Sequence, residues 1–546
     1  MRIQRIYLLL YSLFFIQISC NDDKRYTNFS KEIKQIEVKN SSNLFWQHLD
    51  IEKDTTPGVS LGRAIETLPK RKITPVIIAI LDQEIDIYSD KLSEIIWRNS
   101  KEIEGDNIDN DNNGYVDDIQ GWNFRGNNQG ISSSASVNEY VRVVRDYENK
   151  NLTVEITLEE YERAKKKLDS KLKKAKEDKE YADMLERIVS EKEKIIVPLL
   201  KKNKYTVGDL NSLINSSSDS IVKKYSKILI GFLENNWNYE SILKYQKETT
   251  QYLVETLNVD FNDRSLQKDD PYNINDIYYG NNNVSSNLDE ATHGTIVSGI
   301  LARFYEYFKE NNEMSPIKIM PVVISGSGEN PDKDIAVAIK YAVDNGASII
   351  SLSFGKEFST HDSWVKDAIL YAQINEVLIV SSAGNSYNNI DNPSIYNYPN
   401  DTEGNIEFSN NFIKVGSSSR HLDKRLKSRF SNYGKEQVDI FAPGDSIQTL
   451  LPFNKTKWER GTSLSSPLVS GIAALIRAYY PSLTASEVKQ ILMDSGVEYD
   501  ILVDVPTKEN PEQQLPFNQL SKSGKIVNAY NAMLMAEQFV KEKKKK

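Results

Sequence analysis

The sequence predicts an α/β protein built on a mostly parallel central sheet, with a helical insert in the middle of the chain. Short, continuous apolar runs, the first of them at residues 75–81, are typical of strands buried on both faces of a parallel sheet. From residue 317 onward such runs alternate with helical patterns, which indicates parallel strands joined by right-handed crossovers. Residues 134–257 differ in composition, because Lys and Glu surround apolar residues at helical spacing.

The composition limits the classes of function. A chain of 546 residues exceeds one ordinary domain, which favours a large domain with insertions. Apolar residues, at 39%, suffice for a packed core, while 27% charged residues argue against a membrane-embedded protein. The net charge of −9 lacks the basic character of nucleic-acid binders, so we expect no nucleic acid as a partner.

The N-terminus carries the pattern of an export signal. Arg2 and Arg5 precede an apolar run, 6–16, that is too short to span a bilayer. Cys20, the only cysteine, excludes an internal disulfide and resembles the processing site of bacterial lipoproteins, which implies a lipid anchor on Cys20. A plain signal peptide that ends in cysteine is the alternative. The acidic stretch 21–24 resembles the tag of surface lipoproteins, so the predicted location is the outer membrane or cell surface of a Gram-negative bacterium.

Polar residues directly follow two of the predicted strands. Asp82 ends the run at 75–81, and Asn385 comes just after the strand predicted at 376–382. Because the carboxyl ends of parallel strands meet at one edge of a sheet, these side chains are candidates for a common site. The alternative for each is a residue that forms a turn. Further strands are predicted at 317–323 and 347–352, and further helices at 334–345 and 363–375.

Two reactive side chains stand at predicted helix starts. Ser463 lies on a tight turn after Gly461, which leads into an apolar helix, 468–480, with Pro467 in its first turn. The unpaired N–H groups of a helix start favour negative charge, as the oxyanion of an acyl transfer requires. An ordinary helix cap is the alternative for Ser463. His293 opens another helix beside a glycine, which suits a side chain that faces a cleft.

An acidic loop at 106–118 has the spacing of a calcium loop. Counted from Asp109, oxygen-bearing side chains occupy positions one, three, five and nine, with Gly114 at position six. Gln120 stands where such loops have a bidentate glutamate. We therefore predict a structural calcium site, with an Asn/Asp-rich surface turn as the alternative. The predicted ligands are Asp109, Asp111, Asn113, Tyr115 and Asp117.

The insert is predicted to be helical. Thr157 begins a capping box, and apolar residues then recur every seven positions as in a coiled coil, although two lysines interrupt the seam. Further helices are expected at 218–235 and 239–257. Such an insert could guard a substrate cleft, bind a protein partner or be decoration. The heptad positions are Tyr161, Leu168, Ala175, Ala182 and Val189.

These patterns divide the chain into five parts. Two segments that are far apart in the sequence form the main domain, because the insert interrupts it. Polar residues before it form a tether, and a further helix is expected after it. The predicted parts are a signal peptide (1–19), an N-terminal tether or lead-in (20–70), the main domain (71–133 and 258–500), the helical insert (134–257) and a C-terminal extension (501–546).

Taken together, the polar residues at the strand ends and helix starts resemble the subtilisin-like serine proteases. The order Asp, His, Ser along the chain is that of subtilisin, unlike the order in chymotrypsin. The local sequences match as well, and the resemblance covers about 71–130 and 260–500. They are Ile80-Leu81-Asp82, His293-Gly294-Thr295, Ser351-Leu352-Ser353-Phe354-Gly355, Ser382-Ala383-Gly384-Asn385, Phe430-Ser431-Asn432-Tyr433-Gly434, Ala442-Pro443-Gly444 and Gly461-Thr462-Ser463.

The resemblance implies a three-layer α/β fold and an endopeptidase that acts on polypeptides and requires no cofactor for its chemistry. Ser463 would attack the scissile carbonyl, His293 would transfer the proton, and Asp82 would orient the imidazole. Asn385 and the backbone N–H of Ser463 would hold the oxyanion. The family's substrate-binding positions correspond to Ser351, Ser353, Gly355, Ala383 and Gly384.

Two departures leave an alternative open. Gln83 and Glu84 stand where the family usually has a small residue and a glycine, and Glu84 could place a second negative charge near the Asp–His pair. The alternative is therefore a weakened or inactive surface lipoprotein that binds peptides. An esterase or lipase is disfavoured, because in those enzymes the histidine follows the serine in the chain.

Overall fold

The computed structural model describes residues 45–545, apart from 134, 152, 155, 203, 311–313, 405 and 508. Cys20 and the predicted signal peptide lie outside the described residues. Within that range no helix combines the length and apolar character that a membrane span needs.

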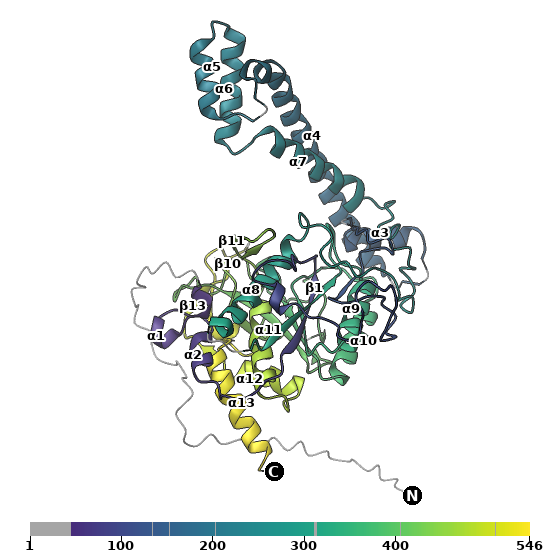
Figure 1. The fold of residues 1–546 in the computed structure, drawn as a ribbon, viewed down its shortest axis with the longest axis vertical. Coiled ribbons are helices and arrows are strands. Elements are labelled where there is room, and N and C mark those ends of the chain that lie inside the picture. Colours follow the sequence, from purple (N-terminus) through teal and green to yellow (C-terminus); the bar gives the residue numbers. More distant parts are fainter. Residues whose placement is uncertain are drawn as a thin grey trace, which may run out of the picture.

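A large, mostly parallel sheet forms the centre of the molecule, as the apolar runs predict (Figure 1). In the described residues it has nine strands, in the order β12-β15-β9-β8-β5-β4-β1-β3-β2. Every pairing is parallel except the one between β12 and β15 at the edge. The strands are β1 (Val76–Asp82), β2 (Trp122–Asn123), β3 (Ile317–Val323), β4 (Ile349–Leu352), β5 (Leu378–Ser382), β8 (Phe412–Ser418), β9 (Ile440–Pro443), β12 (Val497–Glu498) and β15 (Lys525–Ile526).

Helices cover both faces of this sheet, which gives the predicted three layers. Alternate residues of β1 belong to different cores: Ile78 and Ile80 lie in one core with α8 (Thr292–Glu310) and α11 (Thr462–Tyr479). Ala79 and Leu81 lie in the other core, with α9 (Asp332–Asp344) and α10 (Asp362–Ile374). A strand that is apolar at every position is thus explained by burial on both faces.

Both ends of the described chain join the main body. Trp46, Val59 and Leu61 from the segment predicted as a tether are buried in the same core as α11. In the predicted C-terminal extension, β15 pairs with β9 of the main sheet. The remaining elements here are η1 (Trp46–His48), α1 (Ile51–Asp54), α2 (Leu61–Glu66), η2 (Ser93–Ile95), α12 (Ala485–Asp494), η4 (Phe517–Gln519), α13 (Ala529–Lys543) and the short pairs β6 (Thr402–Glu403) with β7 (Ile406–Glu407), β10 (Ile447–Leu451) with β11 (Lys455–Glu459), and β13 (Leu502–Asp504) with β14 (Gln514–Pro516).

The insert is helical and stands out from the main body (Figure 1). Its heptad pattern becomes one long helix, α4 (Leu158–Leu200), with the predicted capping box at Thr157. The buried seam includes Leu168, Ala175 and Ala182. Two predicted helices appear as α6 (Ser220–Glu234) and α7 (Tyr239–Gln251), and the structure adds α3 (Glu139–Glu148), α5 (Val207–Ser216) and a π-helical turn, η3 (Tyr252–Thr256).

The prediction for the helix after Ser463 was wrong at its start. We expected Pro467 in the first turn, but α11 begins at Thr462 and Pro467 lies within the helix. A proline there has no N–H for the carbonyl four residues earlier, which is that of Ser463. The Ser353 hydroxyl donates a hydrogen bond of 3.2 Å to this carbonyl instead. Replacement of the missing helical bond by a side chain explains how the helix tolerates Pro467.

Candidate active site

The predicted site residues lie at the carboxyl edge of the parallel strands and at the starts of the helices that cover one face. Asp82 is the last residue of β1, and Asn385 follows β5. His293 and Ser463 are each the second residue of a helix, α8 and α11. This edge is where functional side chains gather in open parallel sheets.

Asp82 and His293 form a direct pair. Oδ1 of Asp82 and Nδ1 of His293 are 2.7 Å apart. Asp82 is buried, whereas 37% of the His293 side chain is exposed. The buried carboxylate therefore fixes the ring, and the other ring nitrogen, Nε2, remains for a substrate or a nucleophile.

The surroundings of His293 favour its charged form. Burial is the largest effect and lowers the pKa, but the charge of Asp82 and its hydrogen bond raise the pKa and outweigh burial. Glu459, the last residue of β11, adds a smaller effect in the same direction. The net result is a pKa above the ordinary value of 6.5, so the imidazole can hold a proton during a reaction.

The close approach of α8 to the end of β1 makes this pair possible. A Cβ on Gly294 would lie 2.4 Å from the backbone oxygens of both Gln83 and Glu84, so only glycine fits. The Gln83 side chain accepts a hydrogen bond from the N–H of His293, at 3.1 Å. It thereby satisfies one of the free N–H groups at the start of α8.

Glu84, the departure that raised doubt about activity, is tied to a different segment. Its carboxylate accepts hydrogen bonds from the Ser286 hydroxyl and, at 2.7 Å, from the N–H of Asn287. These bonds fasten the segment before α8 to the end of β1. Glu84 therefore has a structural role in the loop that carries His293.

Asn385 is held so that its amide nitrogen remains available. Its side-chain oxygen accepts hydrogen bonds from the N–H and the hydroxyl of Thr462, at 2.9 Å and 3.0 Å. The position that a Cβ of Gly461 would occupy lies 3.5 Å from Nδ2 of Asn385 and 3.7 Å from the backbone nitrogen of Ser463. Both nitrogen atoms therefore lie near one point that glycine leaves empty. They remain the predicted donors to an oxyanion.

The Ser463 hydroxyl donates to the backbone oxygen of Ser353, at 3.0 Å. With the bond from the Ser353 hydroxyl to the Ser463 carbonyl, it joins the start of α11 to the segment after β4. The Ser463 side chain is half-buried, and a hydroxyl can rotate toward another acceptor.

A cavity of about 330 Å³ opens beside Ser463 and Asn385. Ser353, Gly355 and Gly384 line it, in agreement with their predicted place near the substrate. Ser351 and Ala383, which were predicted with them, are fully buried and lie outside the lining. Their contribution is to the packing of β4 and of the turn after β5.

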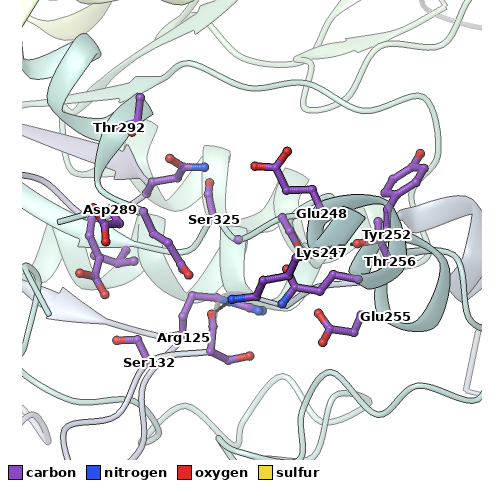
Figure 2. Close-up of a pocket in the computed structure, with 18 residues that line it drawn as sticks. Arg125, Ser132, Lys247, Glu248, Tyr252, Glu255, Thr256, Asp289, Thr292 and Ser325 are labelled. Atoms are coloured by element: carbon purple, nitrogen blue, oxygen red, sulfur yellow. Dashed lines mark hydrogen bonds between the residues drawn. The ribbon is translucent and has the colours of Figure 1, made fainter. Parts of the chain in front are cut away.

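A second cavity, of about 410 Å³, lies next to the Asp–His pair (Figure 2). Asp289 approaches it from the segment before α8, Thr292 is the first residue of α8, and Arg125 and Ser132 come from the loop after β2. The opposite wall is formed by the insert: Lys247 and Glu248 of α7 with Tyr252, Glu255 and Thr256 of η3. The insert therefore borders the site directly.

The acidic loop groups its carboxylates differently from the prediction. Asp109 and Asp111 come together with Glu102, so that one oxygen from each lies within 4.8 Å of the others. Asp117 instead accepts hydrogen bonds from the N–H groups of Gly105 and Asn107, both at 3.0 Å. Among the other predicted ligands, the Asn113 amide donates to Asp118, and the Tyr115 ring packs on Trp122 and Tyr341.

Three residues affect the site through contacts that were not predicted. They are Thr462, which bonds Asn385, Gln83, which bonds the N–H of His293, and Glu459, which raises the pKa of His293. Thr462 is adjacent to Ser463 and could have been suspected as a partner of Asn385. Nothing in the sequence connects β11 with His293, because strand β11 was not predicted. The insert lines both cavities. The sequence left this open, because guarding a substrate cleft was one of three alternatives for the insert.

The structure thus shows an Asp82–His293 pair and places Ser463 at the start of a helix, beside Asn385 in one cavity. Comparison with known proteins identifies the family. Residues 74–519 match the Subtilase family, so the chain belongs to it. It is 32% identical over 217 residues to the cell wall-associated protease of Bacillus subtilis (strain 168). The matched residues make up 39% of this chain and 22% of that protein.

Other relatives match over similar lengths. Subtilisin DY of Bacillus licheniformis is 30% identical over 224 residues, which is 39% of this chain and 73% of subtilisin DY. A thermophilic serine proteinase of Bacillus sp. (strain AK1) is matched over 43% of its own length, so the chain spans less than half of two of these relatives. The solved structure of a cold-adapted subtilisin-like serine proteinase is 23% identical, with a TM-score of 0.32 over 44% of this chain and 74% of that one.

The Asp–His pair can be tested without an assay of activity. Replacing Asp82 by Asn removes the charge that raises the pKa of His293, so burial then dominates and the pKa falls. An NMR titration of the His293 ring should give a pKa above 6.5 in the wild type and a lower value in Asp82→Asn. The ring of His421, which faces Arg425 and Asp423, serves as the internal control and should not change. An unchanged pKa of His293 would contradict the pairing.

Proposed function

We propose that the protein is an exported serine endopeptidase that hydrolyses peptide bonds. The observations that support this proposal are the bond between Asp82 and His293 and the place of Ser463 and Asn385 in the wall of one cavity. Membership of the subtilase family supports it. The substrate is a polypeptide.

In the proposed mechanism the Ser463 hydroxyl leaves the carbonyl of Ser353 and turns to Nε2 of His293, which takes its proton as Oγ attacks the scissile carbonyl carbon. The carbonyl oxygen gains negative charge and accepts hydrogen bonds from Nδ2 of Asn385 and the N–H of Ser463. His293 then gives the proton to the leaving amine. Water hydrolyses the acyl-enzyme by the same steps, and Ser463 is regenerated. Asp82 keeps the imidazole oriented and stabilises the imidazolium.

A fluorophosphonate probe tests the nucleophile. The wild type should form a covalent adduct on Ser463, detected by mass spectrometry, and should cleave a peptide library. Ser463→Ala should lose both, whereas Asn385→Ala should keep the nucleophile but lower kcat by about 10²–10³, the loss seen when a subtilisin loses this donor.

Ser212→Ala, at an exposed position on α5, is the matched control and should behave as the wild type. Folded wild-type protein that forms no adduct and cleaves no peptide would contradict the proposal. It would favour the alternative of a surface lipoprotein that binds peptides without cleaving them.

We also propose that Cys20 carries a lipid that holds the protein at the outer membrane or cell surface. The basis is the signal-like segment before Cys20 and the acidic residues after it. The wild type should incorporate a labelled fatty acid and partition into detergent, and Cys20→Ser should do neither. Incorporation of the labelled fatty acid into Cys20→Ser would contradict the assignment of Cys20 as the lipid attachment site.

A structural calcium site in the acidic loop is a further part of the proposal. Glu102, Asp109 and Asp111 supply hard oxygen ligands, which suit Ca²⁺, and Glu102 replaces Asp117 in the predicted set. Added Ca²⁺ should raise the melting temperature, because a ligand at 100 times its Kd adds about 2.7 kcal/mol to the free energy of unfolding. Glu102→Gln should abolish the rise, while Glu104→Gln, at a neighbouring exposed position, should keep it. An equal rise in melting temperature with Ca²⁺ in both variants would contradict the proposed calcium site.

A further inference from the structure

One charged residue in the cavity beside Ser463 comes from the insert. Arg163 lies near the start of α4 and lines this cavity together with Ser353, Asn385 and Ser463. The insert thus reaches the place where a substrate would bind.

Two aromatic rings of the main body hold the Arg163 guanidinium. Its central carbon lies 3.8 Å from the centroid of the Tyr396 ring and 4.2 Å from that of Phe358. Stacking on aromatic faces uses the plane of the guanidinium and leaves its N–H groups free at the edges. In the part of the chain that the structure describes, Arg163 takes part in no hydrogen bond or ion pair.

The other charged groups that line the cavity are already paired or bonded. Lys356 is buried, with its nitrogen 2.7 Å from a carboxylate oxygen of Asp332 and 3.3 Å from one of Glu139. Glu357 forms an ion pair with Lys167, at 2.6 Å.

The last of these groups is the Glu329 carboxylate. Glu329 accepts the N–H of Glu139, at 2.7 Å, and burial raises its pKa above the ordinary value. Among the described cations that line this cavity, Lys356 is paired with carboxylates and Arg163 is the one without an ion pair. Its positive charge is available to a ligand.

We propose that Arg163 makes the cavity select an acidic side chain, Asp or Glu, in the substrate residue whose carbonyl Ser463 attacks. The inference rests on the proposed endopeptidase function and adds its specificity. The pocket next to the nucleophile receives that side chain in Ser-His-Asp proteases. A carboxylate can take two parallel hydrogen bonds from a guanidinium, an arrangement that an amide or an aliphatic side chain cannot reproduce.

The rest of the lining is compatible with a polar side chain. Serine and asparagine residues of β5 and of the segment after it also line the cavity, and their side chains can bond the remaining carboxylate lone pairs. They include Ser382, Ser386, Asn388 and Ser394. In this arrangement the insert supplies the charge and the main body supplies the catalytic groups.

The test compares fluorogenic peptides that differ only in the residue before the cleaved bond: Glu, Asp, Gln, Leu or Lys. The wild type should cleave the Glu or Asp peptide with a kcat/KM about tenfold or more above that for the Gln peptide. Arg163→Gln should abolish this ratio, and Arg163→Lys should keep part of it. Arg163→Glu should shift the preference toward Lys.

Arg187→Gln is the matched control, because it makes the same change on the same helix, about 36 Å further along at 1.5 Å per residue. It should leave the ratio unchanged. The reaction of each variant with a fluorophosphonate and its melting temperature separate a loss of folding from a loss of selectivity. Arg163→Lys keeps the cation for stacking if Arg163→Gln fails to fold.

The outcomes also separate this inference from the proposed function. A wild type that reacts with the probe and cleaves peptides without preference for Glu or Asp would overturn the role of Arg163 alone. An unchanged ratio in an active Arg163→Gln variant would do the same. A wild type without adduct or cleavage would instead contradict the proposed function.

Discussion

The hydrogen bond between Asp82 and His293 joins residues 211 positions apart in the sequence, and the arrangement of the site depends on it. It requires that the end of β1 and the start of α8 approach until their backbones touch, which Gly294 allows. Gln83 and Glu84 then fix the approach through hydrogen bonds to the segment that carries His293. The two backbone segments thus bring the residues together, and the Asp82 carboxylate then orients the imidazole and raises its pKa.

A few hydrogen bonds also hold the second half of the site, which contains Asn385 and Ser463. Thr462 occupies the oxygen of Asn385 with two donors, so the amide nitrogen is the part that faces the cleft. Ser353 bonds both the hydroxyl and the carbonyl of Ser463. Pro467 is the reason that this carbonyl is available. These bonds fix the Asn385 amide and the start of α11, whereas the proposed reaction requires the Ser463 hydroxyl to turn away from Ser353.

Much of the main domain could be predicted from sequence because its signals are local. Strands β1 and β5 begin as continuous apolar runs and end in polar residues, and each of the catalytic candidates stands at or next to the end or start of an element. What sequence could not give was contact between distant elements. The place of Glu459 near His293, of Glu102 beside Asp109, and of Arg163 at the cavity depends on tertiary packing, which leaves no periodic signal in the chain. The early start of α11 was missed because a proline usually marks a helix beginning.

The position of the insert in the chain has a thermodynamic consequence. Residues 134–257 lie between Asp82 and His293 and account for more than half of the chain between them. The entropy lost on closing a loop grows only with the logarithm of its length, so these residues weaken closure of the pair by roughly 0.8 kcal/mol. A chain can therefore gain a long helical arm between two members of a catalytic set at little cost to their meeting, provided that the two ends of the arm return to the same place.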